Sequence, residues 1–218
     1  MHHQFQEISI NETLRKLAAN HARKRTDEIV RQFIPRNAPL SALESNYIGA
    51  LGEIAVRVYL GLNPLLEDNY HHHQVDDGDI NWKDLVYDVK TDAVVSRSYN
   101  KIYDGSIKPY EPYACRVWTT KHAKYLPKYT GGLIFCVVEI PDNSKETKKE
   151  DIIRNVIFDN DKVLIVGYVN QADALKRPPT WYTPKNPFTG NQLKYNSENY
   201  IYHHTDLRNL NEIKNDII

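Results

Sequence analysis

The sequence contains little cysteine, little methionine and no excess of either charge, and each shortage excludes a class of protein. Among its 218 residues there are 2 cysteines and 1 methionine, and 28 basic residues balance 28 acidic ones. Cys115 and Cys136 lie far apart in strand-like stretches, so each is interpreted as a buried, reduced thiol rather than as a metal ligand or half of a disulfide. A formal net charge of zero excludes nucleic-acid binding by bulk charge, so any basic surface must be local.

Long apolar runs are also missing. The sequence has no stretch of 18 or more apolar residues, which predicts that there is no membrane-spanning helix and no membrane partner. The early residues lack the charged-then-apolar layout of a signal peptide, and we expect a cytoplasmic protein. An apolar share of 41% and a charged share of 26% are typical of a globular chain. Without an internal repeat or a low-complexity tract, residues 1–218 are expected to form a single domain.

Two helices are predicted in the N-terminal part of the chain. Apolar residues recur with a broken helical period over residues 9–34, and the prolines that follow end this helix. Ser41 is expected to cap the second helix, with Glu44 as its capping-box partner. That helix continues to about Leu60, and Gly61 is placed to end it. Because apolar residues extend most of the way round it, this second helix is expected to be largely buried.

Glu53 and Arg57 are the charged residues in the apolar part of this second helix. Their i,i+4 spacing fits a helix-surface ion pair worth about 0.2–0.5 kcal/mol. Alternatively, Glu53 projects towards carboxylates elsewhere, and a metal ion or a lysine supplies the partner that a buried carboxylate needs. The sequence leaves both explanations open. Gly49 and Gly52 each cost about 1 kcal/mol of helix stability against alanine, which predicts a close approach of the sheet to the helix there.

A predicted hairpin after these helices gathers acidic residues and a lysine. Two short strands are expected on either side of a turn at Lys83-Asp84. Strand residues alternate between faces, so Asp88 and Lys90 share one face, and a two-residue turn sets Asp79 opposite Asp88. An exposed edge with a weak ion pair, worth about 0.2–1 kcal/mol, is the simpler explanation for Asp88 and Lys90 alone. The additional carboxylates Asp79 and Glu53 favour a functional site instead.

The rest of the chain is interpreted as strands and loops. The continuous apolar run over 133–138 predicts a strand that is buried on both faces. The other elements are strands over 113–119, 156–158, 163–169 and 200–203, a short helix over 171–176, and a closing helix from Thr205 to Ile217.

Three loops carry side chains that could bind something. In residues 97–112 basic and aromatic residues interleave, which fits either an ordinary polar loop or a surface that contacts phosphates and bases. Residues 177–198 form a long irregular segment, which is typical of functional or disordered loops. His71, His72 and His73 are adjacent, so they cannot all face one ion from a regular element, and a solvated loop explains them better than a zinc site.

Glu53, Asp79, Asp88 and Lys90 together suit the hydrolysis of a phosphodiester. Carboxylates are hard oxygen ligands of the kind that Mg²⁺ prefers, and Mg²⁺ is usually held by one or two side chains plus phosphate. Such an ion stabilises the charge that builds on a phosphate. A nearby lysine can orient or deprotonate a water molecule. The sequence contains no phosphate-binding glycine loop that would point to another chemistry.

These motifs resemble the PD-(D/E)XK nuclease superfamily, which includes many restriction endonucleases. The resemblance rests on Gly52-Glu53 in an apolar helix, on Asp79-Ile80, and on Asp88-Val89-Lys90-Thr91, and it covers about residues 44–95; the apolar strand at 133–140 fits the same fold. It implies an α/β fold, a restriction-endonuclease-like mixed sheet flanked by helices. One departure is Gly78, where the family pattern has proline.

The resemblance also assigns roles. Asp79, Asp88 and the Val89 carbonyl would bind the metal, Lys90 would serve the attacking water, and Glu53 would orient a water or assist metal binding. The expected cofactor is Mg²⁺, with Mn²⁺ as the alternative.

The expected organisation is a single nuclease-like domain with an N-terminal helical part. In this description the helical part is 1–62, the catalytic core is about 44–170, and 171–218 is an accessory segment. The expected function is a metal-dependent DNA endonuclease, restriction-type and sequence-specific, whose partner is DNA and which forms a homodimer if it cuts a symmetric site. Two alternatives stay open: a catalytically inactive nucleic-acid-binding or assembly module on the same fold, and a metal protein built on the histidine loop.

Overall fold

The computed structural model describes residues 5–28, 40–65, 78–108, 116–118, 124–140, 159–181, 191 and 198–215. Its helices are α1 (Glu12–Glu28), α2 (Ala42–Leu60), α3 (Ser96–Tyr103), α6 (Gln171–Lys176) and α7 (Asn211–Asn215), with short 3₁₀ turns η1 (Leu126–Lys128) and η3 (His204–Asp206). Its strands are β1 (Gln6–Ser9), β2 (Ile80–Trp82), β3 (Leu85–Val95), β4 (Arg116–Trp118), β5 (Gly132–Ile140), β6 (Lys162–Val169) and β7 (Asn199–Ile201).

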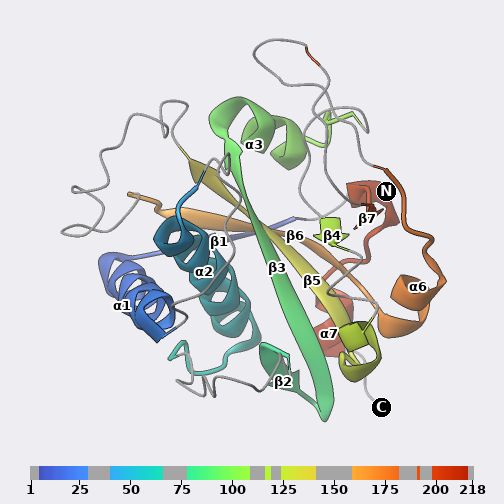
Figure 1. Ribbon diagram of the computed structural model, residues 1–218, viewed down its shortest axis with the longest axis horizontal. Helices are drawn as coiled ribbons and strands as arrows, with labels where there is room; N and C mark the ends of the chain where they lie inside the picture. Colours follow the sequence, from blue (N-terminus) through green and yellow to red (C-terminus); the bar gives the residue numbers. More distant parts are fainter. Residues whose placement is uncertain are drawn as a thin grey trace.

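A five-stranded mixed sheet organises the molecule, in the order β1-β6-β5-β3-β2. The central neighbours β3 and β5 are parallel, and the other pairs in this sheet are antiparallel. Strands β4 and β7 form a separate two-stranded sheet. Helices α1 and α2 lie on one side of the large sheet, and α6 lies on the other in the view of Figure 1. Helix α7 lies on the same side as α2, where the Tyr59 hydroxyl donates to the Asn211 side chain. The molecule therefore has the mixed α/β architecture expected from its sequence.

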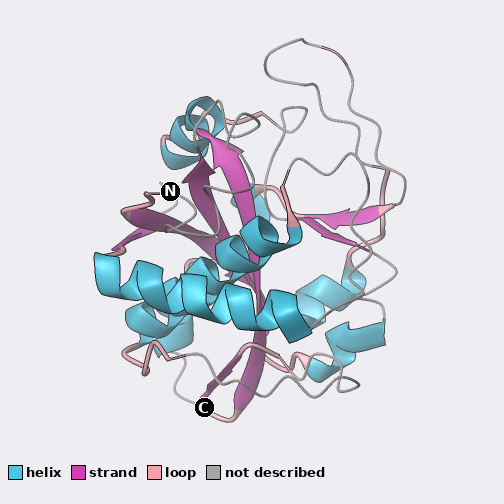
Figure 2. Ribbon diagram, turned by 60° about the vertical axis from the view of Figure 1, so that its left-hand side comes forward, coloured by secondary structure: helices cyan, strands magenta, loops and turns pink. Residues whose placement is uncertain are grey.

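The core has two halves, one on each face of the sheet. The larger half packs α1 and α2 against the sheet, and Figure 2 shows these helices lying across the strands. The smaller half includes residues of α3, η1 and α6. Strand β5 supplies side chains to both halves, with Ile134 and Cys136 in the first and Leu133 and Phe135 in the second. A strand covered on both faces must be apolar throughout, which confirms the prediction made for 133–138.

Helix α2 begins and ends where the sequence predicts. The Ser41 backbone N–H donates to the Glu44 carboxylate (2.6 Å), and the Glu44 N–H donates to the Ser41 hydroxyl (3.2 Å), so the capping box is present. Gly61 ends the helix in the left-handed conformation, with a φ of 76°. The helix packs against α1 on one side and against β3 on the other, which explains why it is apolar nearly all round.

The first element of the chain differs from the prediction. Residues 9–34 were expected to be helical throughout, but α1 starts at Glu12, after Asn11, whose side-chain oxygen accepts from the Leu14 N–H (3.0 Å). Before it, β1 pairs with β6 at the edge of the sheet. A strand of four residues is too short to show a clear period of two. The part of the predicted helix beyond Glu28 lies outside the described residues.

Residues 97–112 are not a simple loop, because α3 occupies Ser96–Tyr103. Tyr99 and Ile102 are buried in the smaller half of the core, while the charged residues of the segment alternate with them at helical spacing. The interleaving of basic and aromatic residues is thus the pattern of an amphipathic helix. Residues 109–112 lie outside the described residues.

Towards the C-terminus the short helix and strand predictions hold and the closing helix does not. α6 matches 171–176, β6 matches 163–169, and β7 overlaps the predicted strand 200–203. Of the predicted strand 113–119, the structure describes β4, and 156–158 lies outside the described residues. The helix predicted from Thr205 to Ile217 is wrong: η3 ends at Asp206 with His203 as its cap, and the short α7 begins at Asn211.

The remaining predictions concern cysteine, histidine and the membrane. Cys136 is a buried free thiol, and burial raises its pKa far above the usual value, so the inert, reduced thiol is confirmed. Cys115 and His71 to His73 lie outside the described residues. Of the helices that the structure describes, none is long and apolar enough to cross a membrane.

Candidate functional site

The β2–β3 hairpin has the predicted turn. Ile80 pairs with Tyr87 and Trp82 with Leu85, which leaves Lys83 and Asp84 as a two-residue turn. Both turn residues have positive φ, 49° and 61°, as a type I′ turn requires. The register therefore agrees with the one inferred from a two-residue turn at Lys83-Asp84.

The two faces of β3 also agree with the prediction. Tyr87 and Val89 belong to the half of the core beneath α2, and Val86 and Val94 pack on the opposite half. Asp88 therefore shares the face of Val86 and Val94 rather than that of α2. Asp88 is 1% exposed, so its carboxylate needs a partner within the protein.

Lys90 is the partner of the buried Asp88 carboxylate. Its Nζ atom lies 2.8 Å from Oδ1 and 2.7 Å from Oδ2 of Asp88. The lysine side chain is 27% exposed, so its ammonium group connects a buried carboxylate to a wetter region. The pair is therefore not a weak ion pair at an exposed edge. Loss of either partner would leave the other charge without its counter-charge.

Asp79 lies immediately before β2, just beyond the residues of β2 that pair with β3. Its backbone N–H donates to the Tyr87 carbonyl (2.9 Å), and its Oδ2 atom accepts from the Val89 N–H (2.6 Å). In a strand the N–H and C=O of one residue point to the same side, so the Val89 carbonyl is directed to the edge at which the Asp79 carboxylate sits. The structure thus brings Asp79 and Val89 together as the resemblance implies.

Gly78 has a φ of 92°, which explains the departure from the family pattern. Proline fixes φ near −65° and could not take this conformation. The turn into Asp79 is therefore made in another way here, while the carboxylate still reaches Val89.

Glu53 projects from α2 one residue after the closest contact between this helix and β3. A Cβ atom at Gly52 would overlap the Thr91 Oγ1 atom, so only glycine permits this approach. The predicted close approach is confirmed at Gly52 and is wrong at Gly49, where a Cβ would meet nothing within 4 Å.

The charge of Glu53 is linked to the hairpin. Burial raises the pKa of the Glu53 carboxyl to about 8, and the negative charge of Asp79 adds to this rise. The positive charges of Arg25, Arg57 and Lys90 oppose it. The side chain keeps part of its surface exposed, while its carboxyl group lies deep enough to be desolvated. Glu53 therefore lies within electrostatic reach of both Asp79 and Lys90.

Arg57 has a role that the sequence did not indicate. Its Nη2 atom donates to the backbone carbonyl of Asp79 (3.1 Å) and its Nη1 atom to that of Asn63 (3.5 Å). The i,i+4 spacing with Glu53 suggested an ion pair between two side chains, but this guanidinium holds the backbone of the hairpin. The acceptors are main-chain atoms from elsewhere in the chain, and no side-chain motif could have predicted them.

The oxygen-rich character of the site fits a hard divalent cation. Among the described residues no three histidine, cysteine, aspartate or glutamate side chains form a cluster able to hold a metal. Mg²⁺ commonly uses only one or two protein carboxylates and fills its other positions with water and substrate phosphate. Two acids that disfavour each other's ionisation, as Asp79 does that of Glu53, would both be stabilised as carboxylates by a cation between them.

Replacement of Glu53 by glutamine is expected to stabilise the metal-free protein at alkaline pH. The folded-state pKa is raised from an ordinary value of 4.5, so stability is fully present below about pH 4.5 and is lost as pH rises towards 8. One pKa unit corresponds to about 1.4 kcal/mol, and we expect Glu53→Gln to gain on the order of 2 kcal/mol at pH 8 and close to nothing at pH 4.5.

Urea unfolding in EDTA at the two pH values would measure this difference. Glu212→Gln on the exposed surface of α7 is the control and should show no such pH-dependent gain. An equal effect of Glu53→Gln at both pH values would contradict the assignment.

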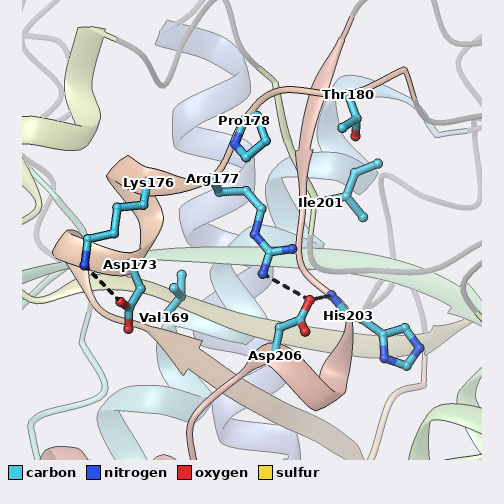
Figure 3. A pocket seen from close by; sticks show the side chains of 9 residues that line it. All are labelled: Val169, Asp173, Lys176, Arg177, Pro178, Thr180, Ile201, His203 and Asp206. Atoms are coloured by element: carbon cyan, nitrogen blue, oxygen red, sulfur yellow. Dashed lines mark hydrogen bonds and ion pairs between the residues drawn. The ribbon is translucent and has the colours of Figure 1, made fainter.

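A separate pocket of about 730 Å³ opens beside α6 and β7 (Figure 3). Asp206 accepts from Arg177 across it (3.0 Å), and Lys176 lies 4.0 Å from Asp173. From the segment 177–198, Arg177, Pro178 and Thr180 line this pocket. Val169, which lines the pocket, lies on β6 and pairs with Leu133 of β5. Leu133 in turn pairs with Asp88 of β3, so the pocket and the Asp88 position lie in register across the sheet.

Comparison with models of protein families, with characterised proteins and with solved structures gave no match.

Proposed function

We propose that this protein is a Mg²⁺-dependent DNA endonuclease of the PD-(D/E)XK type that hydrolyses phosphodiester bonds. The observation that carries the proposal is the construction of the β2–β3 hairpin. It buries Asp88 against Lys90 and, one residue along, directs the N–H of Val89 to the carboxylate of Asp79. Glu53 extends from α2, which covers the face of β3 opposite Asp88, and its carboxyl group is affected by the charges of Asp79 and Lys90.

The residues that would hold the ion are Asp79, Asp88 and the Val89 carbonyl, with Glu53 assisting. Mg²⁺ supplies, when bound, a positive charge that stabilises negative charge as it develops on the scissile phosphate, and Mn²⁺ can replace it. Asp88 keeps the Lys90 ammonium close to this region (2.7 Å). Glu53, with its raised pKa, is able to hold a proton near neutral pH and to release it when a cation approaches.

The roles proposed for Lys90 and Glu53 differ because their surroundings differ. Lys90 is partly exposed, so its ammonium can reach a water molecule that approaches the phosphate from solvent. Glu53 lies deeper, and its carboxyl group orients a water or completes the ion's surroundings. In this proposal Lys90 would act on the attacking water, and the carboxylates would hold the ion in place.

DNA is the proposed substrate, and a restriction-type, sequence-specific enzyme is the proposed form. A homodimer is expected if both strands of a symmetric site are cut. Because the net charge is zero, binding should depend on local contacts and should weaken steeply with salt only where phosphates are touched.

Incubation of the purified protein with plasmid and phage DNA, with Mg²⁺ or with EDTA, tests the proposal. Discrete fragments that require Mg²⁺ would support a site-specific endonuclease, and a smear would support a nonspecific one. DNA that is bound but stays intact in Mg²⁺ and in Mn²⁺ would overturn the enzymatic proposal in favour of a binding module on the same fold.

Lys90→Ala is expected to reduce cleavage about 100-fold while DNA binding persists, because positioned proton transfer typically contributes at least this factor. Nicking rates and filter binding measured on the same preparation separate the two effects. Lys16→Ala removes a lysine that is 63% exposed on α1 and serves as the control for loss of one positive charge. Equal losses of cleavage and binding in Lys90→Ala would show that the lysine only attracts DNA.

A further inference from the structure

Asp79 sits in a short stretch of chain that the hairpin ladder does not fix by itself. The pairing of β2 with β3 extends from Trp82 back to Ile80, and Asp79 lies just beyond it at a bend. Two hydrogen bonds tie Asp79 to β3, one through its backbone N–H and one through its carboxylate. Neither of these bonds connects Asp79 to α2, the helix that carries Glu53.

The guanidinium of Arg57 connects Asp79 to α2. It leaves the last turn of α2, one helical turn after Glu53, and donates to the Asp79 carbonyl at 3.1 Å. Its second amino group donates to the carbonyl of Asn63, two residues after the helix C-cap Gly61, at 3.5 Å. A planar fork with two donors suits this task, because it can engage two carbonyls from one rigid group.

We propose that Arg57 is a positioning residue for the carboxylate site, and the proposal rests on the function proposed above. By holding the main chain of Asp79 against the end of α2, Arg57 sets the separation of the Asp79 and Glu53 carboxyl groups. Arg57 donates to the Asp79 carbonyl, whereas the Asp79 carboxylate accepts from the Val89 N–H. Groups that orient metal ligands in this way typically contribute 10–100-fold to metal affinity.

Arg57 also carries a positive charge one helical turn from Glu53 on α2. A lysine at position 57 would keep this charge, but it could not bridge two carbonyls with a fixed fork. The charge and the bridge can therefore be separated by substitution.

Two variants of Arg57, compared with the full-length wild-type protein, test the proposal. Arg57→Lys keeps the charge and loses the fork, and Arg57→Met keeps the apolar stem alone. We expect Mn²⁺ affinity, measured from free Mn²⁺ by electron paramagnetic resonance, to fall about tenfold in Arg57→Lys and further in Arg57→Met. Arg23→Lys, at a half-buried arginine that donates to Asn20 on α1, is the matched control and should bind Mn²⁺ as the wild type does.

Amide hydrogen exchange without metal gives a readout that does not depend on any activity. Loss of the bridge should accelerate exchange of the Val89 N–H at least tenfold, because the Asp79 carboxylate that accepts it becomes mobile. Amides between β5 and β6 should not change. Uniform acceleration across the sheet, or Val89 exchange and Mn²⁺ affinity equal to the wild type in Arg57→Lys, would overturn the positioning role. If the wild type itself fails to bind Mn²⁺, the proposed function falls, while Val89 exchange still decides the role of Arg57.

Discussion

Asp88→Asn is expected to reduce DNA cleavage about 1,000-fold, which is the upper part of the range for removal of one charge-stabilising group from an active site. The side chain keeps its size, but the neutral amide lacks the negative charge with which a carboxylate binds a hard cation. The substitution also releases Lys90, whose Nζ now contacts both oxygens of the acid. We therefore expect the variant to lose both ion binding and the fixed position of the Lys90 ammonium.

The matched control for this variant lies four residues earlier on the same hairpin. Asp84→Asn makes the same chemical change at an exposed turn residue with a φ of 61°, a conformation that asparagine adopts readily. We expect unchanged cleavage and unchanged or slightly higher stability. Single-turnover cleavage rates in saturating Mg²⁺, with far-UV circular dichroism to confirm folding, would measure both variants. Cleavage by Asp88→Asn within tenfold of the wild type would remove Asp88 from the site.

Gly52→Ala is expected to destabilise the protein by about 2–3 kcal/mol, because a new methyl group would overlap a strand that cannot easily move away. The atoms it meets belong to Thr91, in the middle of β3, where the strand pairs with Cys136 of the buried strand β5. Relief by separation of α2 from β3 would also move Glu53 away from Asp79, so cleavage should fall together with stability.

Gly49→Ala on the same helix should have the opposite sign. A Cβ there meets nothing within 4 Å, so alanine should stabilise α2 by about 0.5–1 kcal/mol through its higher helix propensity. Urea denaturation of both variants gives the comparison. Adding Thr91→Ala to Gly52→Ala should restore part of the lost stability, as expected for residues in direct contact. A double variant no more stable than Gly52→Ala would show that the clash lies elsewhere.

The local patterns that predicted the site were those with a strong periodicity or a specific cap. Alternation from Val86 to Lys90 fixed the faces of β3, because a shift of one residue would have placed Asp88 in the core beneath α2. The turn was correct although Lys83-Asp84 is not a strong hairpin turn pair. Ser41 and Glu44 predicted the start of α2 because a capping box depends only on nearby atoms.

The features that the sequence did not predict depend on distant partners. β1 is a strand because residues 162–165 pair with it, and its own four residues carry no pattern that predicts this pairing. α3 was interpreted as a loop because its basic and aromatic side chains dominate its composition, whereas Tyr99 and Ile102 decide its fold by entering the core. The contact of Arg57 with Asp79 is of the same kind, because a main-chain acceptor carries no signature in the sequence.

The pairing of β3 with β5 and of β5 with β6 has a consequence for the order in which the proposed site is assembled. The residues of the proposed site all lie between positions 53 and 90, but β3 needs β5 as its parallel neighbour, and β5 needs β6. On the ribosome, the carboxylates and the lysine emerge long before residues 132–169, which complete the sheet that supports them. An incomplete chain would therefore carry the reactive residues without the framework that aligns them. Under the proposed function, a growing polypeptide would therefore gain activity only after residues 132–169 have been synthesised.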